Sequence, residues 1–341
     1  MKYVACHSNY GVLNENGNMF NGVGNVSVKD FLKQMSGLKK QGLNNDISFL
    51  TSDEISVHDA HAFMFIDTPE ANNAYFRKAI STGKPIFLLA WESGIINEKN
   101  TDSRFHTDFN VIFTYDDTLI DHDRYIKVAY SFEFPKNIIK RYHGKKLCCL
   151  IAGNKASSHP QELYSHRLDI IDWFERKHSG DFDLYGQGWS KIIPPRNFIH
   201  RVVNRFSSIN QYIKPRHKSY RGEVNNKLST YEKYLFSICY ENARNVPGYI
   251  SEKIFDCFFA GCVPIYWGAP NISDHIPEHC YIDRRKFEDN EALYNHISQM
   301  KEDEYLNHLQ AIEEFLQTNR MGIFSIDEFS KKIINNILKH I

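Results

Sequence analysis

The chain has 341 residues, and its 41 Lys and Arg balance its 41 Asp and Glu, so its formal net charge is zero. At about 150 residues per domain, this length predicts two domains of ordinary size. The hydrophobic share of 42% and the charged share of 24% exclude a disordered or fibrous chain. The zero net charge excludes a surface that wraps duplex nucleic acid, and we expect no nucleic-acid partner.

The seven cysteines form an odd set with no CxxC pair and no zinc-ligand spacing. They are interpreted as reduced, buried thiols, and no structural metal is expected. The sequence shows neither a signal-peptide pattern nor a run of 18 apolar residues. We therefore expect a cytoplasmic protein.

Short apolar runs alternate with helical patterns in the first half of the chain, which is typical of βα units on a parallel sheet. We expect strands at residues 2–7, 62–66, 86–90 and 109–115, and helices through residues 31–35 and 71–80. The following stretch, up to about Arg141, has little periodicity and is interpreted as a crossing between domains. These patterns predict a first Rossmann-like domain at residues 1–141.

The second half of the chain shows the same alternation of short apolar runs and helical patterns. We expect strands at residues 147–152, 182–186, 234–240 and 262–268, and helices through residues 163–174 and from Ser251 to Gly261. They predict a second Rossmann-like domain at residues 142–324, and an amphipathic helix at residues 325–341 that packs back on the protein. Residues 191–227 hold nine Lys and Arg against one acid, which is typical either of a surface for phosphate groups or anionic membrane, or of a solvated loop.

The most informative stretch is a buried strand that ends in Glu241-Asn242, followed by a turn and a helix that starts near Ser251. Ser251 is suited to cap this helix, whose free N–H groups and dipole offer a docking place for a diphosphate. Lys253 in the first turn opposes the dipole, which indicates an anion bound between the helix end and the ammonium group. The alternative is a solvent-facing Lys253 paired with Glu252 or Asp256.

Three motifs in this stretch, Tyr240-Glu241-Asn242, Gly248–Ile254 and Gly261–Gly268, resemble the carboxy-terminal signature of glycosyltransferase family 10, the α1,3/α1,4-fucosyltransferases. The likeness covers roughly residues 146–287, and in the amino half it rests on Trp91-Glu92-Ser93 and Phe109-Asn110. The resemblance implies the α/β GT-B architecture, in which two Rossmann-like domains face each other across a cleft. It implies that residues 1–141 bind the acceptor and residues 142–324 bind the donor, GDP-fucose, and that fucose is transferred with inversion.

The resemblance also implies roles for single residues. Glu92 matches the catalytic base, with Glu98 as its alternative. The residues that match nucleotide-sugar ligands are Arg167, Asn242, Tyr249, Glu252 and Lys253. The chemistry fits, because displacement at an oxocarbenium-like centre needs a carboxylate for the acceptor proton and cations for the departing diphosphate. Arg167 and Lys253 can supply that charge, so we expect no obligatory metal or other cofactor, with Mn²⁺ or Mg²⁺ at most stimulatory.

The acceptor implied is a bacterial lipopolysaccharide or O-antigen glycan, with α1,3-linkage to GlcNAc or a related sugar. A lipid-linked acceptor would bring the protein to the inner face of the cytoplasmic membrane as a peripheral partner. The alternative function is a catalytically silent nucleotide- or carbohydrate-binding protein of the same fold. The two Asp-x-Asp sequences, at residues 121–123 and 181–183, are interpreted as chance matches to a metal-binding pattern, and Gly22-Val23-Gly24 lacks the third glycine of a dinucleotide fingerprint.

Overall fold

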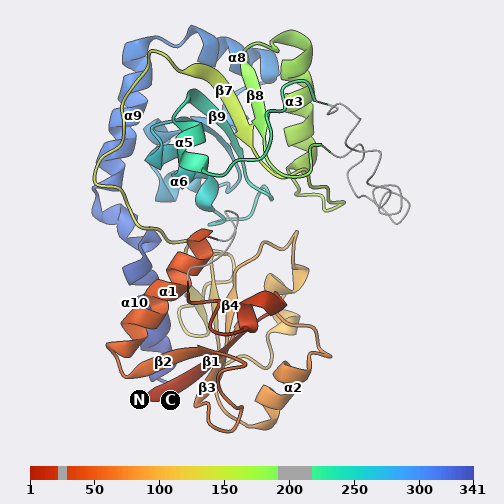
Figure 1. Cartoon of the computed structure of the whole chain (residues 1–341), viewed down its shortest axis with the longest axis vertical. Helices are drawn as coiled ribbons and strands as arrows, with labels where there is room; N and C mark the ends of the chain where they lie inside the picture. The colour runs from red at the N-terminus through yellow and green to blue at the C-terminus, as the bar shows by residue number, and fades with distance from the viewer. Residues whose placement is uncertain (22–28, 191–216) are drawn as a thin grey trace. The chain divides into compact units, whose positions relative to one another are not determined.

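The computed structural model describes residues 1–21, 29–190 and 217–341. It divides the chain into two units, each of which is an α/β unit with its own sheet (Figure 1). Unit 1 comprises residues 1–134, 247–250 and 318–341, and unit 2 comprises residues 135–246 and 251–317. The Gly22-Val23-Gly24 sequence and most of the basic segment at 191–227 lie outside the described residues.

The change from unit 1 to unit 2 lies between Phe134 and Pro135, whereas the sequence predicted it after Arg141. Residues just after 134 already have their partners in unit 2: the ammonium group of Lys140 pairs with Glu313 at 2.5 Å, and the Tyr142 hydroxyl donates to the Met300 carbonyl at 3.1 Å. Such long-range contacts have no local sequence pattern, which explains the difference.

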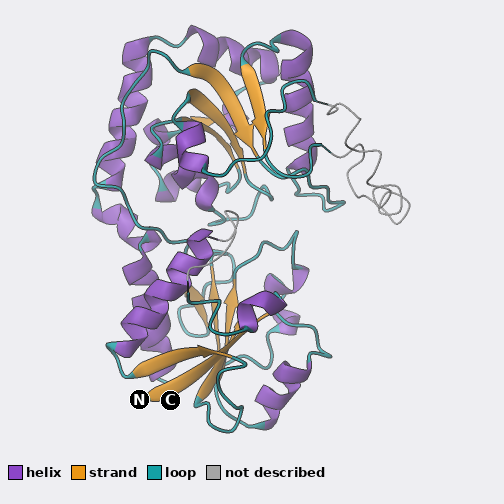
Figure 2. Cartoon of the chain, in the orientation of Figure 1, coloured by secondary structure: helices purple, strands orange, loops and turns teal. Residues whose placement is uncertain are grey.

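Unit 1 is built on a six-stranded parallel sheet with the strand order β2-β1-β3-β4-β5-β6 (Figure 2). Its strands are β1 Lys2–Ser8, β2 Ile47–Thr51, β3 Ala62–Ile66, β4 Ile86–Ala90, β5 Val111–Thr114 and β6 Tyr125–Lys127. Its helices are α1 Lys29–Leu43, α2 Ala74–Ser81 and α10 Ile326–Leu338, with short 3₁₀ turns that include η2 Glu98–Asn100. Every residue of β3 and β4 is buried, because helices and loops cover both faces of a parallel sheet.

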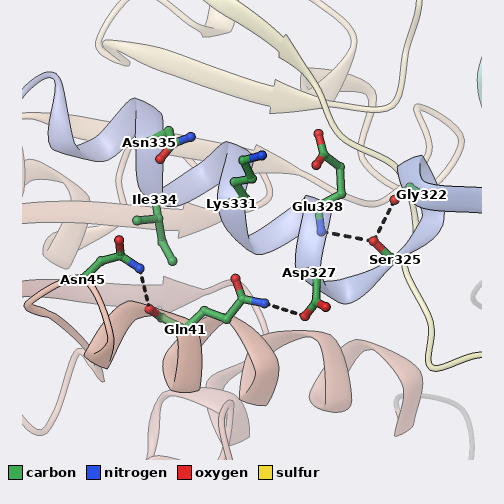
Figure 3. Close-up of a pocket in the computed structure, with 9 residues that line it drawn as sticks. All are labelled: Gln41, Asn45, Gly322, Ser325, Asp327, Glu328, Lys331, Ile334 and Asn335. Carbon is green, nitrogen blue, oxygen red and sulfur yellow. Dashed lines mark hydrogen bonds between the residues drawn. The ribbon is translucent and has the colours of Figure 1, made fainter. Parts of the chain in front are cut away.

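Helix α10 packs against α1 within unit 1. Phe329, Ile333 and Ile337 on its apolar face belong to the same buried cluster as Leu32 and Met35 of α1. Figure 3 shows the polar rim beside this contact, where the Gln41 amide donates to Asp327 at 2.6 Å and a cavity of about 380 Å³ lies between the helices. Helix α10 thus completes the core of unit 1.

Unit 2 is built on a five-stranded parallel sheet with the strand order β11-β10-β9-β7-β8. Its strands are β7 Lys146–Ile151, β8 Phe182–Tyr185, β9 Tyr234–Tyr240, β10 Val263–Trp267 and β11 Ile282–Asp283. Its helices are α3 Tyr164–Lys177, α5 Lys227–Tyr231, α6 Glu252–Phe259, α7 Ile272–His275, α8 Asn290–Gln299 and α9 Glu302–Leu316, and η6 Arg284–Lys286 follows β11. Two parallel sheets of Rossmann-like order confirm the predicted α/β class.

All seven cysteines are buried and free, as their apolar neighbours predicted. Within the described ranges, no helix combines the length and the apolar character that crossing a membrane requires.

Candidate functional site

A polar pocket lies at the carboxyl edge of the unit 1 sheet, beside the point where the strand order reverses between β1 and β3. Ser8 pairs in register with Ile66, and Ile66 with Leu89, so the residues that follow these strands meet at one edge. The pocket has a volume of about 670 Å³. Its lining is rich in amides and hydroxyls: His7, Ser8, Asn9, Tyr10, Gly11, Asn14, Asp67, Thr68, Glu70, Asn72, Asn73, Glu92, Ile96 and Asn97. Open α/β sheets place ligands at this kind of edge.

Glu92 lines this pocket, two residues after the end of β4. Its Oε1 accepts a hydrogen bond from the Tyr10 hydroxyl at 3.1 Å. Glu98, the alternative base, lies exposed in η2 and is not one of the pocket's lining residues. Of these two carboxylates, Glu92 therefore lines the polar pocket and Glu98 does not.

Asp67 is another of the acids that line this pocket, and it was not among the residues singled out from the sequence. It directly follows β3, is 3% exposed and has a φ of +63°. Its Oδ1 accepts the backbone N–H groups of Trp91 at 2.9 Å and Glu92 at 2.8 Å, and the Asn100 amide at 2.7 Å. The sequence shows that an aspartate follows a buried strand, but only the structure shows that this aspartate has a sparsely populated backbone conformation.

Burial raises the pKa of Asp67 to about 6, because its N–H partners only partly offset the loss of water and the charge of Glu92 adds to the effect. Asp67 and Glu92 thus lie in one polar pocket, which Glu70 also lines, and the raised pKa of Asp67 makes this group of carboxylates suited to accepting a proton from a bound hydroxyl group.

In unit 2, Glu241 follows β9 and is fully buried. Its Oε1 accepts the Ser251 N–H at 2.8 Å, and its Oε2 accepts the Ser251 hydroxyl at 2.6 Å and the Lys253 ammonium at 3.1 Å. The Glu241 carboxylate thus occupies the amino terminus of α6. In this structure a carboxylate of the chain itself lies between the helix end and Lys253, and the Ser251 hydroxyl bonds to Glu241 instead of capping the helix.

Lys253 and Glu252 remain charged in this network. Burial alone would lower the pKa of Lys253, but the carboxylates of Glu241 and Glu252 outweigh it and raise that pKa. Burial would likewise raise the pKa of Glu252, yet the ammonium groups of Lys253, at 3.7 Å, and Lys227, at 4.0 Å, lower it to about 2. The positive charge of Lys253 is therefore balanced within unit 2.

Arg167, on α3, is 3% exposed and holds the end of β9. Its Nη2 donates to the carbonyl oxygens of Tyr240 at 2.6 Å and Glu241 at 2.7 Å, and to the Asn242 side-chain oxygen at 3.2 Å. The structure thus brings together Arg167, Asn242, Glu252 and Lys253, four of the five predicted nucleotide-sugar ligands, around the end of β9 and the start of α6.

Tyr249, the fifth, lies in the segment that belongs to unit 1. It is 2% exposed, and its ring centroid is 5.0 Å from that of Tyr115 and 6.2 Å from that of Tyr130. Gly248 before it has a φ of +78°, and a Cβ there would collide with the Tyr115 carbonyl and the Lys127 side chain. The sequence missed this packing because Tyr249 is close to the unit 2 motifs along the chain.

Trp267, at the end of β10, was part of the recognised motif but had no assigned role. Its ring centroid lies 4.5 Å from that of His166, and the Cζ atoms of Arg244 and Arg284 each lie 6.0 Å from it. The strand ends align, since Trp267 pairs in register with Tyr240 of β9. The sequence feature that could have drawn attention to Trp267 is an aromatic residue directly before Gly268 at the end of a strand.

Each of the two Asp-x-Asp sequences has at least one acid that is held by protein partners. Asp183 pairs with Lys146 at 2.7 Å and with Arg221 at 2.5 Å, and Asp121 accepts three backbone N–H groups. In the part of the chain that the structure describes, one other group, Asp172, Glu175 and His217, has ligand atoms within 4.8 Å of one another. Glu175 Oε1 there already accepts the N–H and hydroxyl groups of Ser219.

Parts of the chain are similar in sequence to known proteins. Residues 195–320 match the family described as "Glycosyltransferase family 10 (fucosyltransferase) C-term". An α-(1,3)-fucosyltransferase of Helicobacter pylori is 31% identical over 74 residues, which are 22% of this chain and 15% of that protein. An α-(1,4)-fucosyltransferase of Arabidopsis thaliana is 37% identical over 70 residues, 20% of this chain and 17% of that protein. The aligned segments thus span less than a fifth of these relatives.

Solved structures share the fold over the whole chain. A crystal structure of an α1,3-fucosyltransferase has a TM-score of 0.55 at 14% identity and covers 99% of this chain and 90% of that one. The T4 phage protein BGT in complex with UDP-glucose has a TM-score of 0.54 at 11% identity, with 98% and 99% covered. At such identities the likeness concerns the fold, which is the predicted GT-B class. Over residues 195–320, the chain is thus similar to the carboxy-terminal part of glycosyltransferase family 10.

Proposed function

We propose that the protein is a fucosyltransferase that moves fucose from GDP-fucose to a hydroxyl group of a glycan acceptor, with inversion at the anomeric carbon. The observation that carries this proposal is the Glu92 carboxylate in a polar pocket at the carboxyl edge of the unit 1 sheet. The family match supports the donor, and so does the fold shared with a crystal structure of an α1,3-fucosyltransferase with GDP-fucose, at a TM-score of 0.52.

The acceptor binds in the unit 1 pocket in this proposal. The side chains of Asn9, Asn14, Asn72, Asn73 and Asn97 offer both donors and acceptors to the hydroxyl groups of a sugar. The volume of about 670 Å³ is within the range of small-molecule sites. We infer that the acceptor is a lipopolysaccharide or O-antigen glycan, and that the linkage is α1,3 to GlcNAc or a related sugar.

Glu92 acts as the base in this mechanism. The acceptor oxygen attacks the anomeric carbon of fucose as the bond from that carbon to the GDP oxygen breaks, and the acceptor proton passes to Glu92. Tyr10 donates to Oε1, which leaves Oε2 to take this proton. The electron pair of the broken bond goes to the GDP diphosphate, which needs cationic groups around it. We propose that protein cations meet this need without an obligatory metal, and that Mn²⁺ or Mg²⁺ is at most stimulatory.

The proposal includes peripheral contact with the cytoplasmic membrane on behalf of a lipid-linked acceptor. The apolar face of α10 is buried in the unit 1 core, so it is not the source of such contact. The basic segment at 191–227, with nine Lys and Arg, is the sequence feature suited to anionic headgroups. Sedimentation with anionic vesicles, compared with neutral ones, tests this part of the proposal.

The donor and the activity are tested by incubating the protein with GDP-fucose and a panel of galactose- and GlcNAc-terminated glycans. We expect GDP release that depends on the acceptor, and a fucosylated product whose anomeric configuration is inverted. GDP-mannose and UDP-glucose serve as donor controls, and EDTA should leave most of the activity. Binding of GDP without transfer to any glycan would favour the alternative, a catalytically silent binding protein.

A further inference from the structure

Tyr10 presents an aromatic ring to the polar pocket of unit 1. It stands two positions after the end of β1, lines the pocket and is 49% exposed. It is the only Phe, Tyr or Trp among the described residues that line this pocket. In the part of the chain that the structure describes, no other aromatic ring stacks on it. A large aromatic surface in a polar pocket is thus left open to a ligand.

The side chain and the backbone of Tyr10 are both held in place. Its hydroxyl donates to Glu92 Oε1 at 3.1 Å, its N–H donates to Ser8 Oγ at 3.1 Å, and its carbonyl accepts the Leu13 N–H at 2.9 Å. Burial and the carboxylate of Glu92 raise the pKa of Tyr10, so the hydroxyl keeps its proton and remains the donor. The ring is therefore fixed at both ends, and a ligand that packs on it meets a surface that is already ordered.

The groups around the ring suit a sugar and do not suit an anion. Asn9 and Asn72 offer amide groups, and Ile96 adds an apolar side chain that is 40% exposed. Among the described residues of the lining, three are acids and none is Lys or Arg. A pyranose combines hydroxyl groups at its edge with C–H groups on its faces, and these slightly positive C–H groups are attracted to the negative face of an aromatic ring.

We propose that Tyr10 determines how the acceptor sugar lies in the pocket: a C–H face of the pyranose packs on its ring, while its hydroxyl holds Glu92. Naming this sugar the acceptor rests on the proposed function, whereas packing of a sugar on the ring needs only the pocket. Since one side chain makes both contacts, the position of the sugar on the ring sets which of its hydroxyl groups reaches Oε2 of Glu92. Tyr10 is thus a specificity-determining residue for the acceptor and a positioning residue for the base.

Two substitutions of Tyr10 separate the ring from the hydroxyl in steady-state kinetics on the full chain. Tyr10→Phe keeps the ring and loses the bond to Glu92, so kcat should fall about 10-fold or more while the acceptor KM stays near the wild-type value. Tyr10→Leu also removes the ring, so the acceptor KM should in addition rise about 3- to 10-fold. The KM of GDP-fucose should not change in either variant. A residue that only supports the fold would not divide its effects between kcat and KM in this way.

Tyr3→Leu is the matched control, because Tyr3 is another partly exposed tyrosine of unit 1, at 37%, but does not line the pocket. Its kcat and acceptor KM should equal those of the wild type. A second measurement needs no donor: saturation-transfer NMR with methyl β-galactoside and methyl β-N-acetylglucosaminide. Saturation of the aromatic protons of the protein should reach the C–H protons of one sugar face in the wild type and in Tyr10→Phe. This transfer should be lost in Tyr10→Leu.

Three results separate this inference from the proposed function. An unchanged acceptor KM in Tyr10→Leu, with native circular dichroism, would overturn the inference and leave the proposed function standing. Equal rises of KM in Tyr10→Phe and Tyr10→Leu would also overturn it, since the acceptor would then depend on the hydroxyl and not on the ring. Saturation transfer that depends on the ring, in a protein that moves fucose to no glycan, would support the packing of a sugar on Tyr10 and contradict the proposed function.

Discussion

The Oδ1 atom of Asp67 accepts the backbone N–H of Glu92 at 2.8 Å, and the same oxygen accepts the N–H of Trp91. Asp67 follows β3 and Glu92 follows β4, so these bonds tie the ends of two neighbouring strands together. The direction in which Glu92 leaves its strand is therefore fixed by a residue on the adjacent strand. In the proposed reaction, this makes Asp67 a positioning residue for the base.

We predict that Asp67→Ala lowers kcat about 10- to 100-fold, because displacement of a catalytic group by about 1 Å has a cost of this size. GDP affinity should not change, and Asp67→Asn should recover part of the rate, since its amide oxygen can accept the same N–H groups. Steady-state kinetics and calorimetry measure both quantities. Asp121→Ala is the matched control, because Asp121 Oδ1 likewise accepts three hydrogen bonds in unit 1, all from backbone N–H groups, but does not line the pocket. A loss of rate in this control equal to that of Asp67→Ala would contradict the positioning role.

The stability of the protein should depend on the charge of Asp67. Its pKa is raised to about 6 in the folded state from an ordinary 3.8. Between these pH values the folded state holds a proton that the unfolded state has lost, so the free energy of unfolding falls as pH rises through this window. Asp67→Asn lacks this effect. Its stability relative to wild type should rise by about 2–3 kcal/mol from pH 4 to pH 7, measured by urea denaturation.

Asp121→Asn should show the opposite sign. Hydrogen bonds from the backbone N–H groups of Tyr125 and Asp123 lower the pKa of Asp121 in the folded state. The stabilisation by its charge is present above its ordinary pKa and disappears as pH falls through the lowered value. The stability of the variant relative to wild type should therefore be lowest near neutral pH. The same direction of change in both variants would show that the pH effect does not come from these carboxyl groups.

Lys253 should contribute to stability through Glu241. Lys253→Met leaves the fully buried Glu241 carboxylate without its ammonium partner and should lower the free energy of unfolding by about 3–5 kcal/mol. Adding Glu241→Gln to this variant should restore part of the loss, since no buried charge then remains. Lys286→Met is the control, because Lys286 and Glu278 form an exposed pair and its loss should cost about 1 kcal/mol or less. Denaturant-induced unfolding of the wild type and the three variants measures these differences. Equal losses of stability in Lys253→Met and Lys286→Met would refute this role for Lys253.

Helix α10 should be part of the unit 1 core. Ile333→Ala removes a fully buried side chain that packs in the same cluster as α1 and should destabilise the protein by about 2–5 kcal/mol. Leu338→Ala, on the same helix, truncates a side chain that is 40% exposed and should cost much less. Thermal unfolding of both variants provides the comparison. Similar melting temperatures for the two would mean that α10 does not depend on this core.

The sequence predicted those elements whose pattern follows from burial. β3 and β4 were expected at the residues where they occur, because strands buried on both faces are continuous apolar runs. β2 and β6 were missed. The first is an edge strand whose buried and partly exposed residues alternate, and the second has only the three residues Tyr125–Lys127.

Candidate site residues could be named where their type and motif are visible in the sequence. Those that depend on a contact between residues far apart in the chain were missed. Glu92 was recognisable by its motif, but Asp67 reaches it from another strand. Glu241 was visible as the polar end of a strand, yet its bond to Lys253 spans a turn that no local pattern encodes. Arg284 and Arg285 are indistinguishable in the sequence, and only the structure shows that one pairs with Asp283 and the other lies against Trp267.

The central claim, that Glu92 is the base of a fucosyl transfer, is tested most directly by comparing Glu92→Gln with Glu98→Gln. Turnover of GDP-fucose with an accepted glycan should fall roughly 10²- to 10⁴-fold in Glu92→Gln and remain near the wild-type rate in Glu98→Gln, which alters an acid outside the pocket. GDP affinity should be the same in all three proteins, because the substitution keeps the shape of the side chain. Near-normal turnover in Glu92→Gln, with or without a loss in Glu98→Gln, would contradict the account.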